Sequence, residues 1–433
     1  MVNKAITSSE FSSILSKYFL FEDKPHIAIS VSGGADSLAL LILMKNWIIK
    51  NDGKLTIIHF NHSLRKESLK EAKYVERISE NFNLACKVLK WKKINFNSSL
   101  MQSARTARYS KIIDFCEKEQ IISLMTAHHF DDCLETYLMR KERKFTTLGL
   151  NSIPRINIQK NLQILRPFIG IKKKRLIQTC INQNIKWIND PSNENERFER
   201  VRVRKSISKL KIGRLKSLEK ELTDNLKKNI KMEKNLSNFF VKNLIFFDYG
   251  KFSICKNILL DESKSFQIEI IKKILVTCSG KIYPPRYMTV DLLLEKIKNH
   301  KKFKFTIHSC VVDVAYNVIN FYREYKRIIE FIPDKILLKK NESILWDNRF
   351  IIKSNSMDLY CLSMKEKIWL KLKSKFNVEK KEKKIKFDIL KTLPVLKKKD
   401  NFIIPYLSPN QVMTQNSISV TFSPVIPLTK KNF

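Results

Sequence analysis

The chain has 433 residues, enough for two or three domains, and 43% of them are hydrophobic, so it can bury a sizeable core. Its 82 Lys and Arg against 42 Asp and Glu leave a net charge of +40, which predicts an acidic partner, with RNA or DNA as the default. The eight cysteines form no C-x-x-C pair and no apolar run approaches ~18 residues, which argues against zinc, iron–sulfur and membrane-spanning classes and predicts a soluble, cytosolic protein.

Between residues 26 and 143, short apolar runs typical of buried strands alternate with stretches of helical periodicity. Strands are predicted at 26–31, 55–60, 84–89 and 121–127, and helices at 35–50, 67–82, 101–118 and 131–143. This order predicts an α/β fold in which helices cover a parallel sheet. Ligands bind such sheets at the carboxyl ends of the strands, and three polar junctions fall there, at residues 32–37, 59–65 and 128–132.

Beyond residue 143 the pattern is less regular. We expect a loop at 146–167, helices at 172–184, 197–211 and 215–244, a turn at Pro284-Pro285-Arg286 before another helix, and strands at 350–353 and 401–404. These elements predict a parallel-sheet nucleotide-binding domain over 1–211, a mainly helical linker domain over 212–328, and a small C-terminal α/β module over 329–433.

A glycine-containing loop joins the first predicted strand to the first predicted helix, and its residues are Ser32, Gly33, Gly34, Ala35, Asp36 and Ser37. The glycines let the backbone approach a phosphate, and the amides at the helix start face the anion with the helix dipole behind them. Asp36 would repel a phosphate unless a cation lies between them, so the loop implies Mg²⁺. No lysine follows the glycines, so the loop is not of the G-x-x-x-x-G-K-S/T type.

This hexad resembles the signature of the N-type ATP pyrophosphatases, which cleave ATP between the α and β phosphates and adenylate a substrate oxygen. The hexad alone does not distinguish the members of that family. Five further stretches resemble motifs of tRNA(Ile)-lysidine synthetases: H-x-N-H-x-L-R at 59–65, A-R-x-x-R-Y at 104–109, T-A-H-H-x-D-D-x-x-E-T at 126–136, W-x-x-D-x-S-N at 187–193 and W-D-x-R-F at 346–350. One stretch departs from the family: residues 141–144 read K-E-R-K in place of a glycine-containing R-G-S-G, so no site residue is taken from it.

The resemblance implies a two-step reaction on tRNA. ATP would adenylate the C2 oxygen of the wobble cytidine in the CAU anticodon of tRNA(Ile), and the ε-amino group of free lysine would displace AMP. The product, lysidine, changes codon reading and charging from methionine to isoleucine. The resemblance also implies Mg²⁺ as the cofactor of ATP, and tRNA contacts from both parts of the chain beyond residue 211.

Three alternatives stand beside this interpretation. A 2-thiocytidine thiolase would need clustered cysteines, and an amidotransferase-type synthetase would need a glutaminase segment; neither is evident. A non-catalytic RNA-binding protein with a decayed nucleotide fold is the third, and the intact Asp36, Asp132 and Glu135 argue against decay.

Carboxylates in the 131–143 helix are candidates for the lysine site. Asp132 and Glu135 are spaced i, i+3 and can share one helical face, and the lysine implied by the resemblance would supply the opposing charge. Asp131 is expected to cap the helix instead. Asp36 and Asp132 are candidate catalytic residues, and Asp36 is also the candidate Mg²⁺ ligand.

Histidines near the predicted strand ends are candidates for the nucleotide pocket. His59 joins residues 32–37 as a candidate ATP contact in the pocket wall. Either His128 or His129 could accept a proton from the attacking amine, while the other packs beneath the loop.

Two groups of arginines complete the predicted site. Arg105 and Arg108 lie on one helical face, where either could pair with a phosphate or with a structural acid such as Glu117; Arg105 is the candidate for a catalytic phosphate contact. A run of arginines follows the turn-rich stretch and could contact RNA phosphates or the reacting centre: Arg200, Arg202 and Arg204, of which Arg204 is the candidate catalytic residue.

Overall fold

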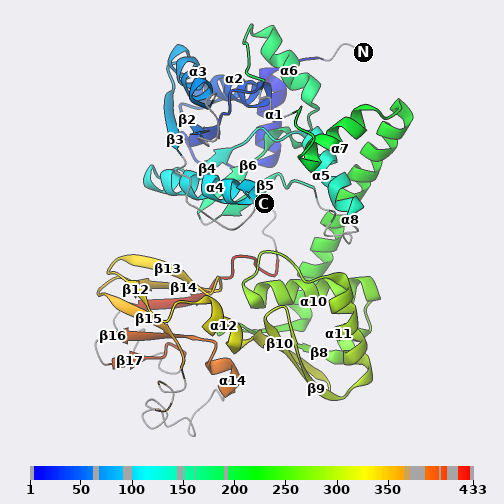
Figure 1. The fold of residues 1–433 in the computed structure, drawn as a ribbon, viewed down its shortest axis with the longest axis vertical. Coiled ribbons are helices and arrows are strands. Elements are labelled where there is room, and N and C mark those ends of the chain that lie inside the picture. Colours follow the sequence, from blue (N-terminus) through cyan, green and yellow to red (C-terminus); the bar gives the residue numbers. More distant parts are fainter. Residues whose placement is uncertain are drawn as a thin grey trace. The chain divides into compact units, whose positions relative to one another are not determined.

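A computed structural model describes residues 4–61, 68–90, 100–143, 150, 152–159, 161–189, 194–365, 368, 370, 386–398, 401–406 and 418–429, with only the backbone of 100–106 (Figure 1). The chain forms two compact units, Met1–Asn229 with Phe433 and Ile230–Asn432. The further division of the second half at residue 328 stays a prediction. No helix in the described ranges is long and apolar enough to cross a membrane.

The first unit contains a six-stranded sheet in the order β3-β2-β1-β4-β6-β5. Its strands are β1 (His26–Ser30), β2 (Lys54–Asn61), β3 (Ala85–Lys90), β4 (Ser123–Met125), β5 (Ile156–Gln159) and β6 (Leu162–Leu165). All neighbours pair in parallel except β5, which is antiparallel to β6. The predicted α/β fold with a parallel sheet is confirmed.

One local prediction in this unit is wrong. Residues 146–167 were expected to form a loop, but 156–165 form the β5–β6 hairpin. Each of these strands has four residues, too few to show a period, and β6 is held by its pairing with β4 some 40 residues earlier, as in Ser123 with Gln163.

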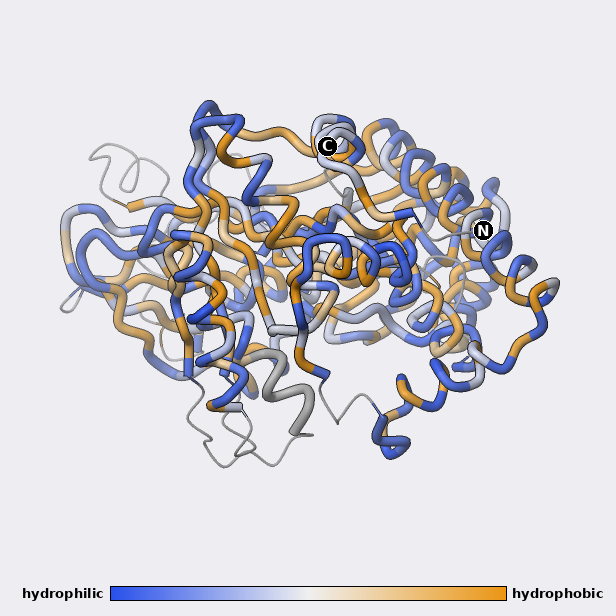
Figure 2. The backbone as a smooth tube through the Cα atoms, turned by 90° about the horizontal axis from the view of Figure 1, so that it is seen from above, coloured by the Kyte–Doolittle hydropathy of each residue, from blue (hydrophilic) through white to orange (hydrophobic). Residues whose placement is uncertain are grey.

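The helices of the first unit cover the sheet; the first of them was not predicted, and the later ones follow the predicted order. They are α1 (Ser8–Tyr18), α2 (Ala35–Lys50), α3 (Ser68–Asn81), α4 (Leu100–Lys118), α5 (Phe130–Glu142), α6 (Lys173–Asn182) and α7 (Glu199–Ser208), with α8 (Ile212–Asn243) beginning in this unit. A 3-10 turn, η2 (Pro167–Gly170), precedes α6. Hydrophobic and hydrophilic stretches are interspersed along the backbone (Figure 2).

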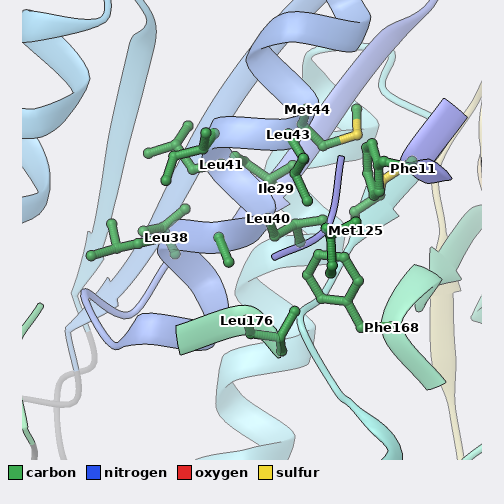
Figure 3. Close-up of a cluster of buried hydrophobic side chains, with 14 of the residues drawn as sticks. Phe11, Ile29, Leu38, Leu40, Leu41, Leu43, Met44, Met125, Phe168 and Leu176 are labelled. Atoms are coloured by element: carbon green, nitrogen blue, oxygen red, sulfur yellow. The ribbon is translucent and has the colours of Figure 1, made fainter. Parts of the chain in front are cut away.

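Helix α2 lies at the centre of the first unit's core. Every residue of α2 from Ala35 to Met44 except Asp36 is buried, because α2 packs against β1 and β2 as well as α1 and α6. Leu40, Leu43 and Met44 meet Phe11, Phe168 and Leu176 there (Figure 3). Each such side chain contributes about 1.5–3 kcal/mol by leaving water, so the loop that opens α2 is carried on a rigid base.

The second unit is built from antiparallel sheets and helices. A five-stranded sheet has the order β7-β8-β11-β10-β9, and sheets of four and three strands have the orders β12-β15-β16-β17 and β13-β14-β18. The strands are β7 (Leu244–Phe247), β8 (Lys251–Cys255), β9 (Lys302–Ile307), β10 (Cys310–Ala315), β11 (Val318–Arg323), β12 (Ile336–Leu338), β13 (Glu342–Trp346), β14 (Phe350–Ser354), β15 (Leu359–Ser363), β16 (Pro394–Lys398), β17 (Asn401–Ile403) and β18 (Ile418–Phe422). The helices are α9 (Lys256–Leu260), α10 (Lys264–Ser279), α11 (Tyr287–Asn299), α12 (Tyr325–Phe331) and α14 (Phe387–Leu390).

A buried ion cluster lies in the second unit, at the W-D-x-R-F stretch. Asp347 accepts two hydrogen bonds from Arg323, at 2.9 and 3.0 Å, and one from Arg349 Nε at 2.6 Å. Arg349 is fully buried and also donates to the carbonyl oxygen of Thr392 at 2.8 Å. This stretch therefore joins β11 to the strands around β14 and serves the fold.

Candidate active site

A cavity of about 240 Å³ lies at the carboxyl ends of β1 and β4, beside the start of α2. Residues from β1, α2, α4, β4, α5 and α7 line it: Ser30, Ser32, Asp36, Ser37, Arg108, Tyr109, Ile112, Leu124, Thr126, Ala127, His128, Asp132 and Arg200. Two of the three predicted polar junctions, residues 32–37 and 128–132, therefore meet at one site, as expected for adjacent parallel strands.

The phosphate loop is closed by its own serines. Ser37 Oγ donates to the carbonyl oxygen of Gly34 at 2.9 Å, and the Ser32 amide donates to Ser37 Oγ at 3.2 Å. Gly33 has a φ of +90°, a conformation that favours glycine, and its carbonyl accepts from the Ile188 amide at 2.9 Å. The segment that carries the W-x-x-D-x-S-N motif thus braces the loop, although residues 190–193 themselves lie outside the described ranges.

Asp36 has one engaged and one unengaged carboxylate oxygen. Its Oδ2 is 3.6 Å from both His129 Nε2 and Lys173 Nζ, while Oδ1 is buried without a hydrogen-bond partner in the part of the chain that the structure describes. Burial raises the pKa of Asp36, but His129 and Lys173 outweigh it and hold the pKa below its usual value. A buried carboxylate oxygen that lacks a donor is a suitable ligand for a hard cation.

The residues around Asp36 fit a Mg²⁺ that is shared with a nucleotide. No group of three or more His, Cys, Asp or Glu side chains in the described residues could hold a metal ion by itself. Mg²⁺ commonly takes one or two carboxylates and completes its shell with phosphate oxygens and water, so Asp36 matches that pattern.

His129 sits among three carboxylates at the start of α5. It is the N-cap residue of the helix: its amide donates to Asp132 Oδ2 at 3.0 Å, and the Asp132 amide nitrogen lies 3.4 Å from His129 Nδ1. Burial lowers the pKa of His129, but Asp131, Asp36 and Asp132 more than compensate and raise it to about 9. An imidazolium therefore balances these acids.

Asp131 does not cap the helix that it was expected to cap. Its Oδ2 accepts from the amide of Lys173 at 2.8 Å, at the first residue of α6. The side chain that caps the start of α5 is that of Asp132, which accepts a hydrogen bond from the amide of the N-cap residue His129. The tertiary contact between α5 and α6 decides this, and sequence spacing does not report it.

Glu135 is buried at 2% exposure and is paired with two arginines. Arg200 Nε donates to its Oε2 at 2.7 Å, and Arg204 Nε donates to its Oε1 at 2.6 Å. Arg200 also reaches Asp132 Oδ1 at 3.2 Å and lines the cavity, which Arg204 does not. Arg202 instead donates to the carbonyl oxygen of Glu196 at 2.7 Å.

Only some of the predicted site residues line the cavity. Ser32, Asp36, Ser37 and Asp132 line it; the lysine role of Glu135 and the catalytic role of Arg204 stay predictions. His59 lies behind the cavity: it is 3% exposed, its Nδ1 is 2.9 Å from the carbonyl oxygen of Val31, and burial lowers its pKa.

Of the two predicted arginines of α4, the structure describes the side chain of Arg108 only. The side chain of Arg105 lies outside the described part, whereas Arg108 lines the cavity. The rest of the H-x-N-H-x-L-R motif, residues 62–65, also lies outside it. Sequence reasoning did not select Lys173, which stands within a run of four cations, residues 172–175, that carries no motif.

Known proteins resemble this chain in sequence over most of its length. Residues 4–211 match the family model of the PP-loop domain. The chain is 34% identical over 414 residues to the tRNA(Ile)-lysidine synthase of Rickettsia akari, covering 92% of this chain and 93% of the relative. It is 31% identical over 427 residues to that of Orientia tsutsugamushi, covering 93% and 94%. Among solved structures, a U34-tRNA thiolase from Methanococcus maripaludis aligns with 51% of this chain and 79% of its own at a TM-score of 0.43 and 15% identity.

Proposed function

The chain belongs to the tRNA(Ile)-lysidine synthase family of PP-loop ATP-dependent ligases, and from that premise we propose that it adenylates the wobble cytidine of the CAU anticodon and joins free lysine to it. The observation that carries the proposal is the cavity beside the phosphate loop, where Asp36, Asp132 and Arg200 converge. A tRNA substrate places the reaction in the cytoplasm.

The first step requires charge neutralisation and alignment. The C2 oxygen of cytidine attacks the α phosphorus of ATP, and the bond from that phosphorus to pyrophosphate breaks with its electron pair on the leaving group. The loop amides and the hydroxyls of Ser32 and Ser37 hold the phosphates, as helix starts commonly do. Asp36 would hold Mg²⁺, which would supply Lewis-acid stabilisation of the phosphate charge.

The second step requires an amine that has lost a proton. The lysine nitrogen attacks C2 of the cytidine and AMP departs with the C2 oxygen. We assign the ammonium site to Asp132, with Glu135 behind it, so the incoming lysine competes with Arg200 for Asp132. Of the two histidines, His128 lines the cavity while His129 is held as imidazolium, so His128 is the better proton acceptor.

We propose that the positively charged part of the chain beyond residue 211 binds the tRNA body. Residues 230–432 contain 39 Lys and Arg against 19 Asp and Glu, a net +20 out of the chain's +40. We propose that residues 212–328 and 329–433 contact tRNA phosphates, which would make binding strongly dependent on salt.

The test is incorporation of radiolabelled lysine into tRNA. The full chain with ATP, Mg²⁺ and tRNA(Ile) bearing a CAU anticodon should incorporate lysine and release AMP and pyrophosphate in equal amounts. The same tRNA with uridine at the wobble position should accept none. Incorporation into both tRNAs, or ATP cleavage without incorporation, would refute the proposal.

A further inference from the structure

The phosphate loop contains no cation of its own. Its six residues include one acid, Asp36, and no Lys or Arg. A triphosphate bound there meets a carboxylate, so positive charge has to come from Mg²⁺ and from side chains elsewhere in the fold. Loops that end in G-K-S/T carry a lysine for this purpose within the motif itself.

One lysine from another helix approaches this loop. Lys173 Nζ lies 3.6 Å from Asp36 Oδ2, close enough for an ion pair but longer than a hydrogen bond. Its side chain is 39% exposed, so it borders solvent and can shift toward a ligand. Lys173 is thus a cation at the loop that retains freedom to move.

The backbone of Lys173 is fixed relative to the loop. Its amide donates to Asp131 Oδ2 at 2.8 Å, which anchors the start of α6 to α5. Further along α6, the buried Cys180 Sγ lies 3.2 Å from the carbonyl oxygen of Ala35 in α2. The contacts of α6 with α5 and with α2 therefore fix the backbone position of Lys173.

The neighbouring cations point elsewhere. Lys172 pairs with Glu219 at 2.6 Å, and Arg175 pairs with Glu10 at 2.6 Å. Lys174 is exposed on α6. Of the run 172–175, Lys173 alone makes an ion pair with the loop among the described contacts.

We propose that Lys173 is a substrate-contacting residue that donates to the departing pyrophosphate of ATP, replacing the lysine that the loop lacks. Asp36 would hold Mg²⁺, and the Lys173 ammonium, which can shift, would then be available to a phosphate oxygen. As the bond from the α phosphorus to pyrophosphate breaks, negative charge grows on the leaving oxygens, and an ammonium at this position stabilises it without giving up a proton. This inference rests on the proposed function.

The test compares Lys173→Met with Lys174→Met in the full chain. With tRNA(Ile), ATP, lysine and Mg²⁺, Lys173→Met should lower the maximal rate of pyrophosphate release about 10²-fold and weaken inhibition by added inorganic pyrophosphate, while Lys174→Met stays within about twofold of wild type. Lys173→Arg should restore part of the rate. The KM for lysine should not change, because the second step does not involve pyrophosphate.

The outcomes separate this inference from the function on which it rests. A wild-type chain that forms no lysidine would reject the proposed function. A wild-type chain that does, with Lys173→Met as fast as Lys174→Met, would reject only the role of Lys173. A slow Lys173→Met with unchanged pyrophosphate inhibition, a lowered melting temperature and no rescue by arginine would reassign Lys173 to structural support.

Discussion

Each unit of this protein contains a buried carboxylate that pairs with two arginines, yet the two clusters serve different ends. In the second unit, Asp347 holds Arg323 and Arg349, whose side chains are 5% and 0% exposed. In the first unit, Glu135 holds Arg200 and Arg204, which are both 37% exposed. The two clusters have the same chemical composition, but their arginines differ in exposure to solvent.

That difference in access decides the role of each cluster. Buried guanidinium groups cannot reach a ligand, so the Asp347 cluster can only cross-link its own strands. Arg200 borders a cavity of about 240 Å³ and also touches Asp132, so its charge is available to a substrate. The burial of its arginines must therefore be known before an arginine-rich motif can be assigned a structural role or a substrate-contacting role.

The largest expected effect concerns Asp36, a carboxylate at the cavity that no ion pair among the described residues joins to an arginine. Asp36→Ala should reduce AMP formation at least ~10³-fold because the phosphate–Mg²⁺ bridge is lost, with the melting temperature nearly unchanged. Removing Mg²⁺ with a chelator should abolish the wild-type rate in the same assay. Normal adenylation by the variant would disprove the metal assignment.

Asp347→Asn should be nearly as costly, but for stability alone. It leaves two buried guanidinium groups short of negative charge, which typically costs about 3–5 kcal/mol. Chemical denaturation should show the second unit unfolding early, while binding of a fluorescent ATP analogue to the first unit is unchanged. Loss of ATP binding would show that the two clusters are not independent.

A smaller effect is expected from the imidazolium of His129. Its folded-state pKa of about 9 lies above the unfolded value of 6.5, so its stabilisation is complete below pH 6.5 and is lost as pH rises through 9. The shift corresponds to about 3 kcal/mol at most. The difference in unfolding free energy between wild type and His129→Asn, which keeps a capping side chain, should therefore shrink between pH 6.5 and 9.5. A constant difference would contradict this assignment.

The tRNA contribution of the second unit should be smaller still. A break after residue 211 would remove Leu218 and Leu222 of α8, which pack with Leu134 and Tyr137 of α5, so the informative fragment is 1–229. It should bind ATP normally but lose tRNA affinity by about 30-fold at moderate salt, with a flatter dependence on salt. Circular dichroism serves as the folding control. Equal affinities and equal slopes would exclude a tRNA-binding role for residues 230–433.

Glu135→Gln should have the mildest effect. Like Asp347→Asn, it removes the negative charge at the centre of a two-arginine cluster. The partly exposed arginines can recruit water, so the cost in stability is expected to be only about 1–2 kcal/mol. Activity should suffer more clearly, with the KM for lysine rising about tenfold and the KM for ATP changing less. A rise in the KM for ATP alone would remove Glu135 from the lysine site.

Much of the first unit was predictable because its signals are local. The buried strand before residue 32 and the apolar helix after it place the phosphate loop, and α2 begins and ends at the predicted residues 35 and 50. The β5–β6 hairpin and most strands of the second unit were not predicted. Those strands are short, and they exist through pairing with distant partners, so no periodicity within them is long enough to read.

The same limit applied to the site. Local spacing placed Asp132 and Glu135 on one face of α5, but it did not show that Glu135 is already paired with Arg200 and Arg204. The nucleotide contact of His59 stays a prediction, and local spacing did not show that its Nδ1 lies 2.9 Å from the carbonyl oxygen of Val31. These contacts cross about 65 and 28 residues of chain, beyond the reach of any local pattern.

The sequence by itself determined the phosphate loop, the parallel sheet that presents it and the family to which the chain belongs, because each depends on residues adjacent in the chain. Tertiary structure alone decided which charges act together. It placed Lys173 of α6 beside Asp36 of α2, and it directed the Asp131 carboxylate to an amide of α6 instead of α5. It also buried Arg349 but left Arg200 at a cavity. Electrostatic interaction depends on distance and burial, and both are properties of the folded chain.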